Sequence, residues 1–276
     1  MIITKEHFKS IAHFMNTIEG RENNPAMEGE HSSRSGSREF TGSDSYSEAK
    51  ELLRYGYKDI LDEIKREVRK YSKIQQTRPQ RQIVNDIIGY APNVPNAIQS
   101  LPNSMVNTIT QPTKVKAVSI VYSIVENCGT DAEEFIKSGI ALLNVINRLE
   151  LSGIRVNLKI AFYAARASSK SSGNDYTFGT VDVKHYREHL DIQKLCFPLA
   201  HPSMFRRFGF KWIETVPGLN NPAWSFGYGK SISDYNDEVV LEHVAPNKDD
   251  KFINLSYMRD ANYNVENIIK EISKSS

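Results

Sequence analysis

The second half of the chain alternates between apolar runs of strand type and of helix type. The run from Val115 to Val125 is almost wholly apolar and β-branched, which is typical of a strand buried on both faces. Apolar residues then recur at helical spacing from Thr130 to Glu150, and the run from Arg155 to Tyr163 alternates as a strand does. Together they predict a βαβ unit with two parallel strands and a right-handed crossover.

Weaker patterns continue to the end of the chain. They predict a third strand, two short helices, a late strand and a closing helix, over residues 176–184, 190–198, 202–212, 252–258 and 264–272. The chain is therefore expected to be an α/β protein, with a three-layer sheet that carries helices on both faces.

The first half predicts helices joined by polar segments. Residues 1–19 have helical spacing, whereas residues 20–41 are rich in Gly, Ser and charge, as a flexible arm is. A helix is expected near 47–53 and another over 59–71, and the prolines between Tyr90 and Pro112 indicate an extended connection. We expect three parts: a helix and arm at 1–42, a helical and proline-rich region at 43–112, and the α/β domain at 113–276.

Composition narrows the class of protein. Hydrophobic residues make up 39% of the 276 residues and charged residues 25%, which is typical of a globular protein. The net charge of +2 is a weak basis for binding nucleic acid or membrane. Two cysteines without C-x-x-C spacing exclude a disulfide scaffold and suit a reducing compartment. No apolar run is long enough for a membrane span, and the start lacks a signal-peptide pattern, so we expect a cytoplasmic protein.

The segment His185–His189 has the form H-x-x-E-H, with Glu188 before the second histidine. On a helix, the two histidines would share one face and could hold Zn²⁺, with the glutamate as general base. This order is similar to that of inverted zinc metallopeptidases, and Glu266 has a similar spacing to their third ligand. The alternative is a polar turn after the strand that ends at Lys184. A zinc hydrolase is thus one alternative function; otherwise no cofactor is expected.

A second cluster contains His201, Arg206 and Arg207. Arginines near a helix start favour an anion site, because guanidinium groups bind carboxylates and phosphates with two hydrogen bonds. The alternative is a packed helix with Met204, Phe205 and Phe208 in the core and one arginine in a salt bridge.

The end of the first predicted strand offers a third site. Ligands bind at the carboxyl ends of strands in open α/β sheets, where this chain has Ser123, Glu126 and Asn127 and the amides of Gly129 and Thr130. A helix N-terminus favours an anion there. The chain has neither of the glycine-rich phosphate-binding motifs, so binding of nucleotides of the usual kinds is unsupported.

The order of elements resembles that of von Willebrand A-type and Rossmann-like domains. The von Willebrand A family holds Mg²⁺ on a D-x-S-x-S motif at the end of its first strand. This chain has Y-S-I-V-E over residues 122–126. The resemblance therefore implies the fold and no magnesium site.

The most basic stretch contains Lys70, Lys73, Arg78 and Arg81. Such a patch could contact phosphates, which makes a nucleic-acid-associated protein a second alternative function. The other interpretation is a polar connection between two elements.

The chain also resembles an uncharacterised family encoded by tailed bacteriophages. The residues that carry this resemblance are Phe40–Ser43, Ser47–Ala49, Gly56, Pro102–Met105, Gly139–Leu142, Leu149–Glu150, Gly153, His201–Pro202 and Arg206–Arg207. The resemblance implies a phage origin and an α/β fold and no established activity. His185 and His189 are not among these residues.

We therefore expect a phage-encoded interaction module without catalytic activity. Its partner would be a phage or host protein, and it would act in the host cytoplasm or in the virion.

Overall fold

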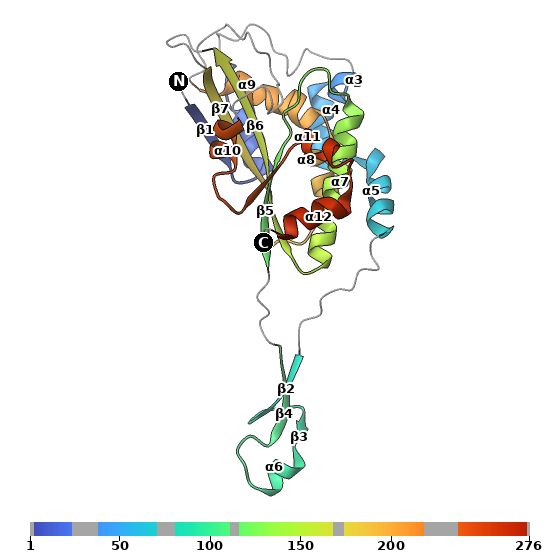
Figure 1. Ribbon diagram of the computed structural model, residues 1–276, viewed down its shortest axis with the longest axis vertical. Coiled ribbons are helices and arrows are strands. Elements are labelled where there is room, and N and C mark those ends of the chain that lie inside the picture. The colour runs from blue at the N-terminus through green and yellow to red at the C-terminus, as the bar shows by residue number, and fades with distance from the viewer. Residues whose placement is uncertain are drawn as a thin grey trace.

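A five-stranded mixed sheet forms the centre of the protein (Figure 1). The structure is a computed structural model that describes residues 3–23, 38–70, 81–110, 116–167, 174–217 and 237–274. The strands follow the order β1-β7-β6-β5-β8 across the sheet. Their bounds are Ile3–Phe8 for β1, Ala117–Ser123 for β5, Arg155–Ala167 for β6, Asn174–Lys184 for β7 and Asp250–Ile253 for β8.

The predicted βαβ unit is confirmed. Strands β5 and β6 run parallel, with Val118 opposite Val156, and helix α7 (Ala132–Leu151) connects them. The side chains of both strands alternate between the two faces of the sheet and are largely buried on each. Strand β8 is parallel to β5, and β7 is antiparallel to β6.

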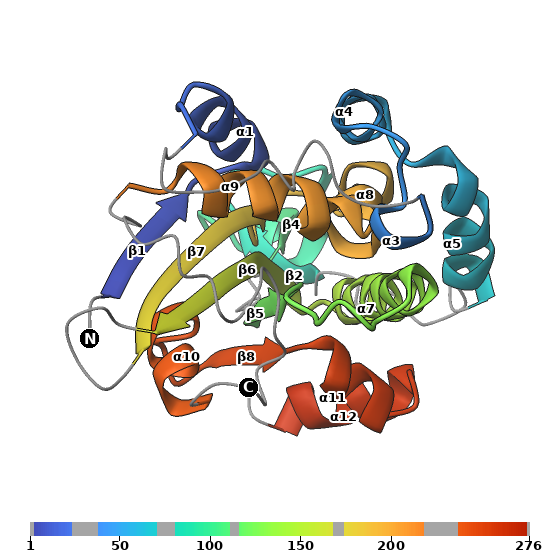
Figure 2. The ribbon, with the colours of Figure 1, turned by 90° about the horizontal axis from the view of Figure 1, so that it is seen from above.

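Helices lie on both faces of the sheet, as expected for a three-layer α/β fold (Figure 2). In β7, the backbone at Gly179 approaches the ring of Trp212 on helix α9 (Phe210–Thr215). The neighbouring Phe178 contacts His243 on helix α10 (Asp237–Val244), with 4.8 Å between ring centroids. Because neighbouring residues of a strand point to opposite faces, α9 and α10 cover opposite faces.

The remaining helices surround this centre. Helix α8 packs along α7, and Phe14 of α1 stacks on Phe162 of the sheet with 5.2 Å between ring centroids. Their bounds are Ile11–Glu19 for α1, Arg38–Thr41 for α3, Tyr46–Tyr55 for α4, Lys58–Lys70 for α5, Ile192–Ala200 for α8, Met204–Gly209 for the π-helix η1, Leu255–Asp260 for α11 and Val265–Lys274 for α12. The predictions of α4, α5, α8 and α12 are confirmed.

The N-terminal prediction was partly wrong. Residues 3–8 form β1, which pairs in parallel with β7, and only residues 11–19 are helical. Ser10 explains the division, because its hydroxyl caps α1 by accepting from the amide of His13. Of the predicted arm, residues 24–37 lie outside the described residues, whereas residues 38–41 form α3.

Two further predictions need correction. The late strand ends at Ile253, because Asn254 caps a helix that follows at once, α11. One short α-helix was predicted over residues 202–212. The structure has the π-helix η1 at Met204–Gly209, and the α-helix α9 follows it directly at Phe210–Thr215.

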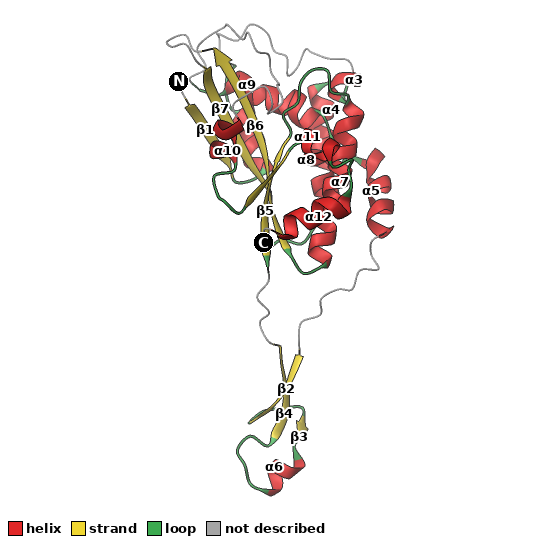
Figure 3. Ribbon diagram, viewed as in Figure 1, coloured by secondary structure: helices red, strands yellow, loops and turns green. Residues whose placement is uncertain are grey.

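Residues 81–110 form a second, three-stranded sheet in the order β2-β4-β3 (Figure 3). Its elements are β2 (Arg81–Asp86), β3 (Ala91–Pro92), α6 (Val94–Ile98) and β4 (Met105–Thr110). The sequence predicted an extended connection over most of this stretch. Pro92 lies in an outer strand and Pro95 in a first helical turn, where a proline removes no needed hydrogen bond. The prolines therefore permit these short elements.

The contact between α7 and α8 generates a prediction. A Cβ at Gly139 would lie 2.4 Å from the Cα of Ala200, so only glycine allows the two helices to pack this closely. We expect Gly139→Ala to lower the free energy of unfolding by roughly 1–3 kcal/mol, because the backbone of α8 must move. Chemical denaturation measures this. In the exposed control Gly129→Ala, the new Cβ meets only one atom, at 3.5 Å, so an equal loss there would contradict the packing argument.

Candidate functional site

Arg206 of η1 is buried at the carboxyl edge of β5 and is bound by backbone oxygens. Its guanidinium donates to the carbonyl of Phe40 at 2.7 Å, of Thr130 at 2.5 Å and of Asn127 at 3.2 Å. It also lies between two rings, at 3.9 Å from the centroid of Phe40 and 4.7 Å from that of Phe135. Burial lowers the pKa of Arg206 to about 10, so the group stays charged at neutral pH. This cation therefore joins α3, η1 and the β5–α7 loop.

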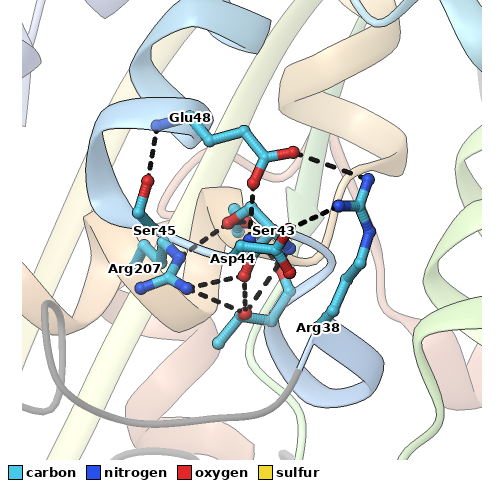
Figure 4. A network of polar contacts seen from close by, with 8 residues as sticks. Arg38, Ser43, Asp44, Ser45, Glu48 and Arg207 are labelled. Carbon is cyan, nitrogen blue, oxygen red and sulfur yellow. Dashed lines mark hydrogen bonds and ion pairs between the residues drawn. The ribbon is translucent and has the colours of Figure 1, made fainter.

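Arg207 is buried beside it and holds the turn that follows α3 (Figure 4). It donates to the hydroxyl of Ser43 at 2.6 Å, to the carbonyl of Ser43 at 2.7 Å and to the hydroxyl of Thr41 at 3.1 Å. The Ser43 hydroxyl is also 2.8 Å from that of Ser203. Ser203 and Arg207 thus both hold the turn 41–43 by hydrogen bonds.

His201 completes this contact as a buried neutral ring. It stacks on Phe197, with centroids 4.6 Å apart and planes 12° apart, and it meets Tyr57 edge-on. Its Nδ1 accepts from the amide of Ser203 at 3.1 Å. Burial lowers the pKa of His201 to about 3. Gly42 adopts φ +77°, and a Cβ there would lie 2.9 Å from the His201 ring, so the turn requires glycine.

The residues at and after the carboxyl end of β5 also form hydrogen bonds within the protein. Ser123 is fully buried, and its hydroxyl accepts from the amide of Val125. Asn127 uses its side-chain oxygen to accept from the amide of Gly129 at 3.0 Å. Glu126 is buried with one oxygen near the hydroxyl of Thr130 at 3.3 Å, while Oε1 has no partner among the described residues. Burial raises the pKa of Glu126 above its ordinary value.

The structure therefore brings the predicted anion-site residues together, but as a structural joint. We call Arg206, Arg207, His201 and the turn 41–43 the arginine joint. Most N–H groups with which the two arginines could bind an anion donate to oxygens of the protein, although Nε of Arg206 has no partner among the described residues, and each arginine is 1% exposed. Met204 and Phe208 are buried in the core, as the alternative interpretation proposed. Anion binding at this place stays a prediction that the geometry does not favour.

The H-x-x-E-H segment is a turn in the structure. Its side chains are exposed, and the amide of Glu188 donates to the carbonyl of His185 at 2.9 Å. Glu266 instead forms an ion pair with Arg148 on α7. Across the described parts of the chain, no group of three or more His, Cys, Asp and Glu residues is placed to hold a metal ion. The geometry thus gives the zinc alternative no support.

The amino ends of β5 and β6 border a hollow of about 560 Å³. Asp182, His185, Lys159 and Lys251 lie on its wall, which thus carries charges of both signs. Oδ2 of Asp182 also lies 3.3 Å from Nε2 of His7, and the two side chains are 35% and 47% exposed. Such a half-exposed contact suits a cross-strand pair better than an enclosed catalytic base.

A different surface emerges in residues 81–110, which we call the apolar insertion. Eight of the eleven exposed large hydrophobic side chains of the described residues lie in it. They are Ile83, Ile87, Ile88, Tyr90, Val94, Ile98, Leu101 and Ile109. No hydrophobic residue of the insertion is buried in the core. Contiguous exposed apolar patches of several hundred Å² are often contact sites in folded proteins.

The sequence pattern revealed neither the sheet of the insertion nor the part that the turn 41–43 plays in the arginine joint. Residues 81–110 contain only two charged residues, Arg81 and Asp86, among many aliphatic ones, and that composition was the available signal. Nothing in the chain marks Thr41 and Ser43 as partners of Arg207, because they are more than 160 residues away. Of the predicted basic patch, residues 71–80 and the side chains of Lys70 and Arg81 lie outside the described parts.

Comparison with known proteins identifies one family. A family model described as "Domain of unknown function (DUF7192)" matches residues 2–275. No curated protein and no solved structure gives a match. Within the described ranges, no helix combines the length and the apolar character that crossing a membrane requires.

The arginine joint predicts a large effect of one side chain on stability. Arg206→Met leaves three carbonyls without their donor, and we expect the free energy of unfolding to fall by about 3–5 kcal/mol. Chemical denaturation of the variant measures the loss. The control Arg66→Met changes an exposed arginine of α5 and should cost at most about 0.5 kcal/mol. Equal losses in the two variants would contradict the joint.

His201 predicts a pH dependence of stability. Its pKa is about 3 when folded and near 6.5 in the unfolded chain, so only the unfolded chain takes up the proton between these values. The contribution of the neutral His201 ring to the free energy of unfolding is therefore complete above pH 6.5. Between pH 6.5 and 3 this contribution falls by about 1.4 kcal/mol for each pH unit. We expect His201→Asn, which cannot titrate, to lose less stability than the natural protein as the pH falls toward 3. Parallel curves of unfolding free energy against pH would refute this.

Proposed function

The chain belongs to the DUF7192 family, and we propose that it is a non-catalytic interaction module. Its α/β body acts as a rigid scaffold, and the apolar insertion is the contact element. The observation that carries this proposal is the concentration of exposed aliphatic and aromatic side chains in residues 81–110, next to a body whose apolar residues are mostly buried.

The exposed side chains of the insertion represent a large amount of apolar surface. The exposed fractions of the eight side chains together equal about five whole side chains. Burying them would release roughly 8–15 kcal/mol, since one large aliphatic side chain contributes about 1.5–3 kcal/mol. At about 25 cal/mol per Å², this corresponds to roughly 300–600 Å² of apolar surface. This apolar surface is shared between two faces, because Ile83 pairs with Thr108 whereas Ile109 pairs with Gln82, the neighbour of Ile83.

The size of the insertion supports the same conclusion. Units of fewer than about 40 residues seldom bury enough surface to be stable alone. The 30 residues of the insertion contribute no buried hydrophobic side chain, although their strands pair in order. A protein that covers these side chains would supply the core that the insertion lacks.

The resemblance to tailed-phage proteins supports a narrower form of the proposal. Three of the segments that carry it, Phe40–Ser43, His201–Pro202 and Arg206–Arg207, contact one another in the arginine joint. We therefore propose that the module acts in a phage-encoded complex, in the host cytoplasm or in the virion. A nucleic-acid contact has less support in the insertion, because phosphates require several cations and the insertion contains one, Arg81.

Site-specific photo-crosslinking tests this function. A benzophenone amino acid at Ile98, which is 78% exposed, should form adducts with protein in extracts of cells that naturally make this chain. The same group at Leu241 of α10, exposed but outside the insertion, is the control and should form few adducts. Ile88→Asp should remove the adducts at position 98, because it places a charge in the apolar contact, whereas Tyr186→Asp should not. Adducts that survive Ile88→Asp, or that form equally at Leu241, would refute the proposal.

A further inference from the structure

We infer that the hollow at the amino ends of β5 and β6 binds a small phosphate monoester that also carries hydroxyl groups. Its volume of about 560 Å³ lies within the usual range of pockets for small molecules. The inference goes beyond the proposed function and does not rest on it, because the hollow lies on the five-stranded sheet and no residue of the apolar insertion lines it.

The strand register places a row of polar side chains on one face of the central sheet. Ser119 of β5 is opposite Asn157 of β6, and Lys159 of β6 is opposite Asp182 of β7. Asn157 and Lys159 are two residues apart, so all four side chains point to the same face. Each of the four is partly exposed, whereas Leu158, which points to the other face, is fully buried. Polar groups therefore line the hollow where a sheet between two layers of helices is usually apolar.

Three of these side chains are hydrogen-bond donors that remain available to a ligand. In the part of the chain that the structure describes, Ser119, Asn157 and Lys159 have no side-chain hydrogen bond or ion pair. Neighbouring strands lie about 4.8 Å apart, and alternate residues of one strand lie roughly 6.6 Å apart. A hydroxyl, an amide and an ammonium group are thus close enough together to bind one oxyanion.

The kinds of donor favour a phosphate over a carboxylate. Proteins commonly bind carboxylates with the planar guanidinium of arginine, and no arginine of the described residues lines the hollow. The ammonium of lysine binds phosphate as a point charge. Three separate donors also match the three terminal oxygens of a phosphate monoester, whereas a carboxylate has only two oxygens.

An acceptor beside these donors favours hydroxyl groups in the same ligand. Asp182 is opposite Lys159 in the register but forms no ion pair with it, and its Oδ2 lies 3.3 Å from Nε2 of His7 instead. Because this carboxylate already has a basic neighbour, a neutral hydroxyl is a better donor to it than a second cation. Acidic side chains accept from ribose hydroxyls in this way in nucleotide sites. Towards β8, Asp249 and Lys251 contribute one charge of each sign, so they leave the balance unchanged.

Isothermal titration calorimetry of the full-length protein tests the inference. The probes are ribose 5-phosphate, glycerol 3-phosphate, inorganic phosphate and ribose. We expect at least one of the two monoesters to bind at one site per chain, at least about tenfold more tightly than inorganic phosphate. Ribose, which lacks the anion, should give no binding heat.

Variants of the donors locate the site. Lys159→Met should weaken binding of the monoester by at least about tenfold, because it removes the cation that binds the phosphate. Ser119→Ala removes one neutral donor and should weaken binding by about threefold or more. Lys65→Met, which changes an exposed lysine of α5, is the matched control and should leave the affinity unchanged. Circular dichroism and the unfolding midpoint verify that each variant is folded, and Ser119→Ala decides the outcome if Lys159→Met is not.

Each outcome either supports or overturns the inference. It is overturned if neither monoester binds, or if inorganic phosphate binds as tightly as the monoesters. Binding that persists in folded Lys159→Met and in Ser119→Ala occurs elsewhere and also overturns it, as does binding that Lys65→Met weakens equally. Binding that the two hollow variants weaken and the control retains supports it. The crosslinking at Ile98 tests the proposed function separately, since the two surfaces share no residue.

Discussion

The guanidinium groups of Arg206 and Arg207 hold together segments that are distant in the sequence. A buried cation is costly unless hydrogen bonds replace its water, and backbone carbonyls and hydroxyls do so here. For Arg206, no carboxylate of the described residues lies within ion-pair distance, and the nearby rings and carbonyls supply the compensation. Since those oxygens belong to residues 40–43 and 127–130, the N-terminal turn and the edge of the sheet are parts of one polar unit.

The sequence predicted the structure best where a pattern of buried side chains repeats within one helix or strand. The apolar run of β5, the spacing of α7 and the alternation of β6 each follow from burial within one element, so the βαβ unit was predictable. Strand β1 was not, because its six residues gain their strand conformation by pairing with β7, some 170 residues later. The late strand was predicted too long because Asn254, an ordinary residue in the sequence, caps a helix.

The candidate site shows the same limit. Residue type correctly indicated that Arg206, Arg207 and His201 form one cluster, but it indicated a ligand where the fold supplies its own oxygens. The partners come from the turn 41–43, which the sequence divided between the end of the flexible arm and the start of the helical region, and no periodicity relates this turn to the arginines. The apolar insertion was overlooked for the opposite reason: aliphatic residues usually imply a core, and composition alone does not tell a buried isoleucine from Ile98.

The position of the insertion in the chain has an evolutionary consequence. Residues 81–110 fall between α5 and β5 and supply none of the buried residues on which the five-stranded sheet depends. Selection can therefore change the exposed side chains of this stretch while the core of the five-stranded sheet keeps its contacts. The surface of the insertion can thus change at little cost to the rest of the fold.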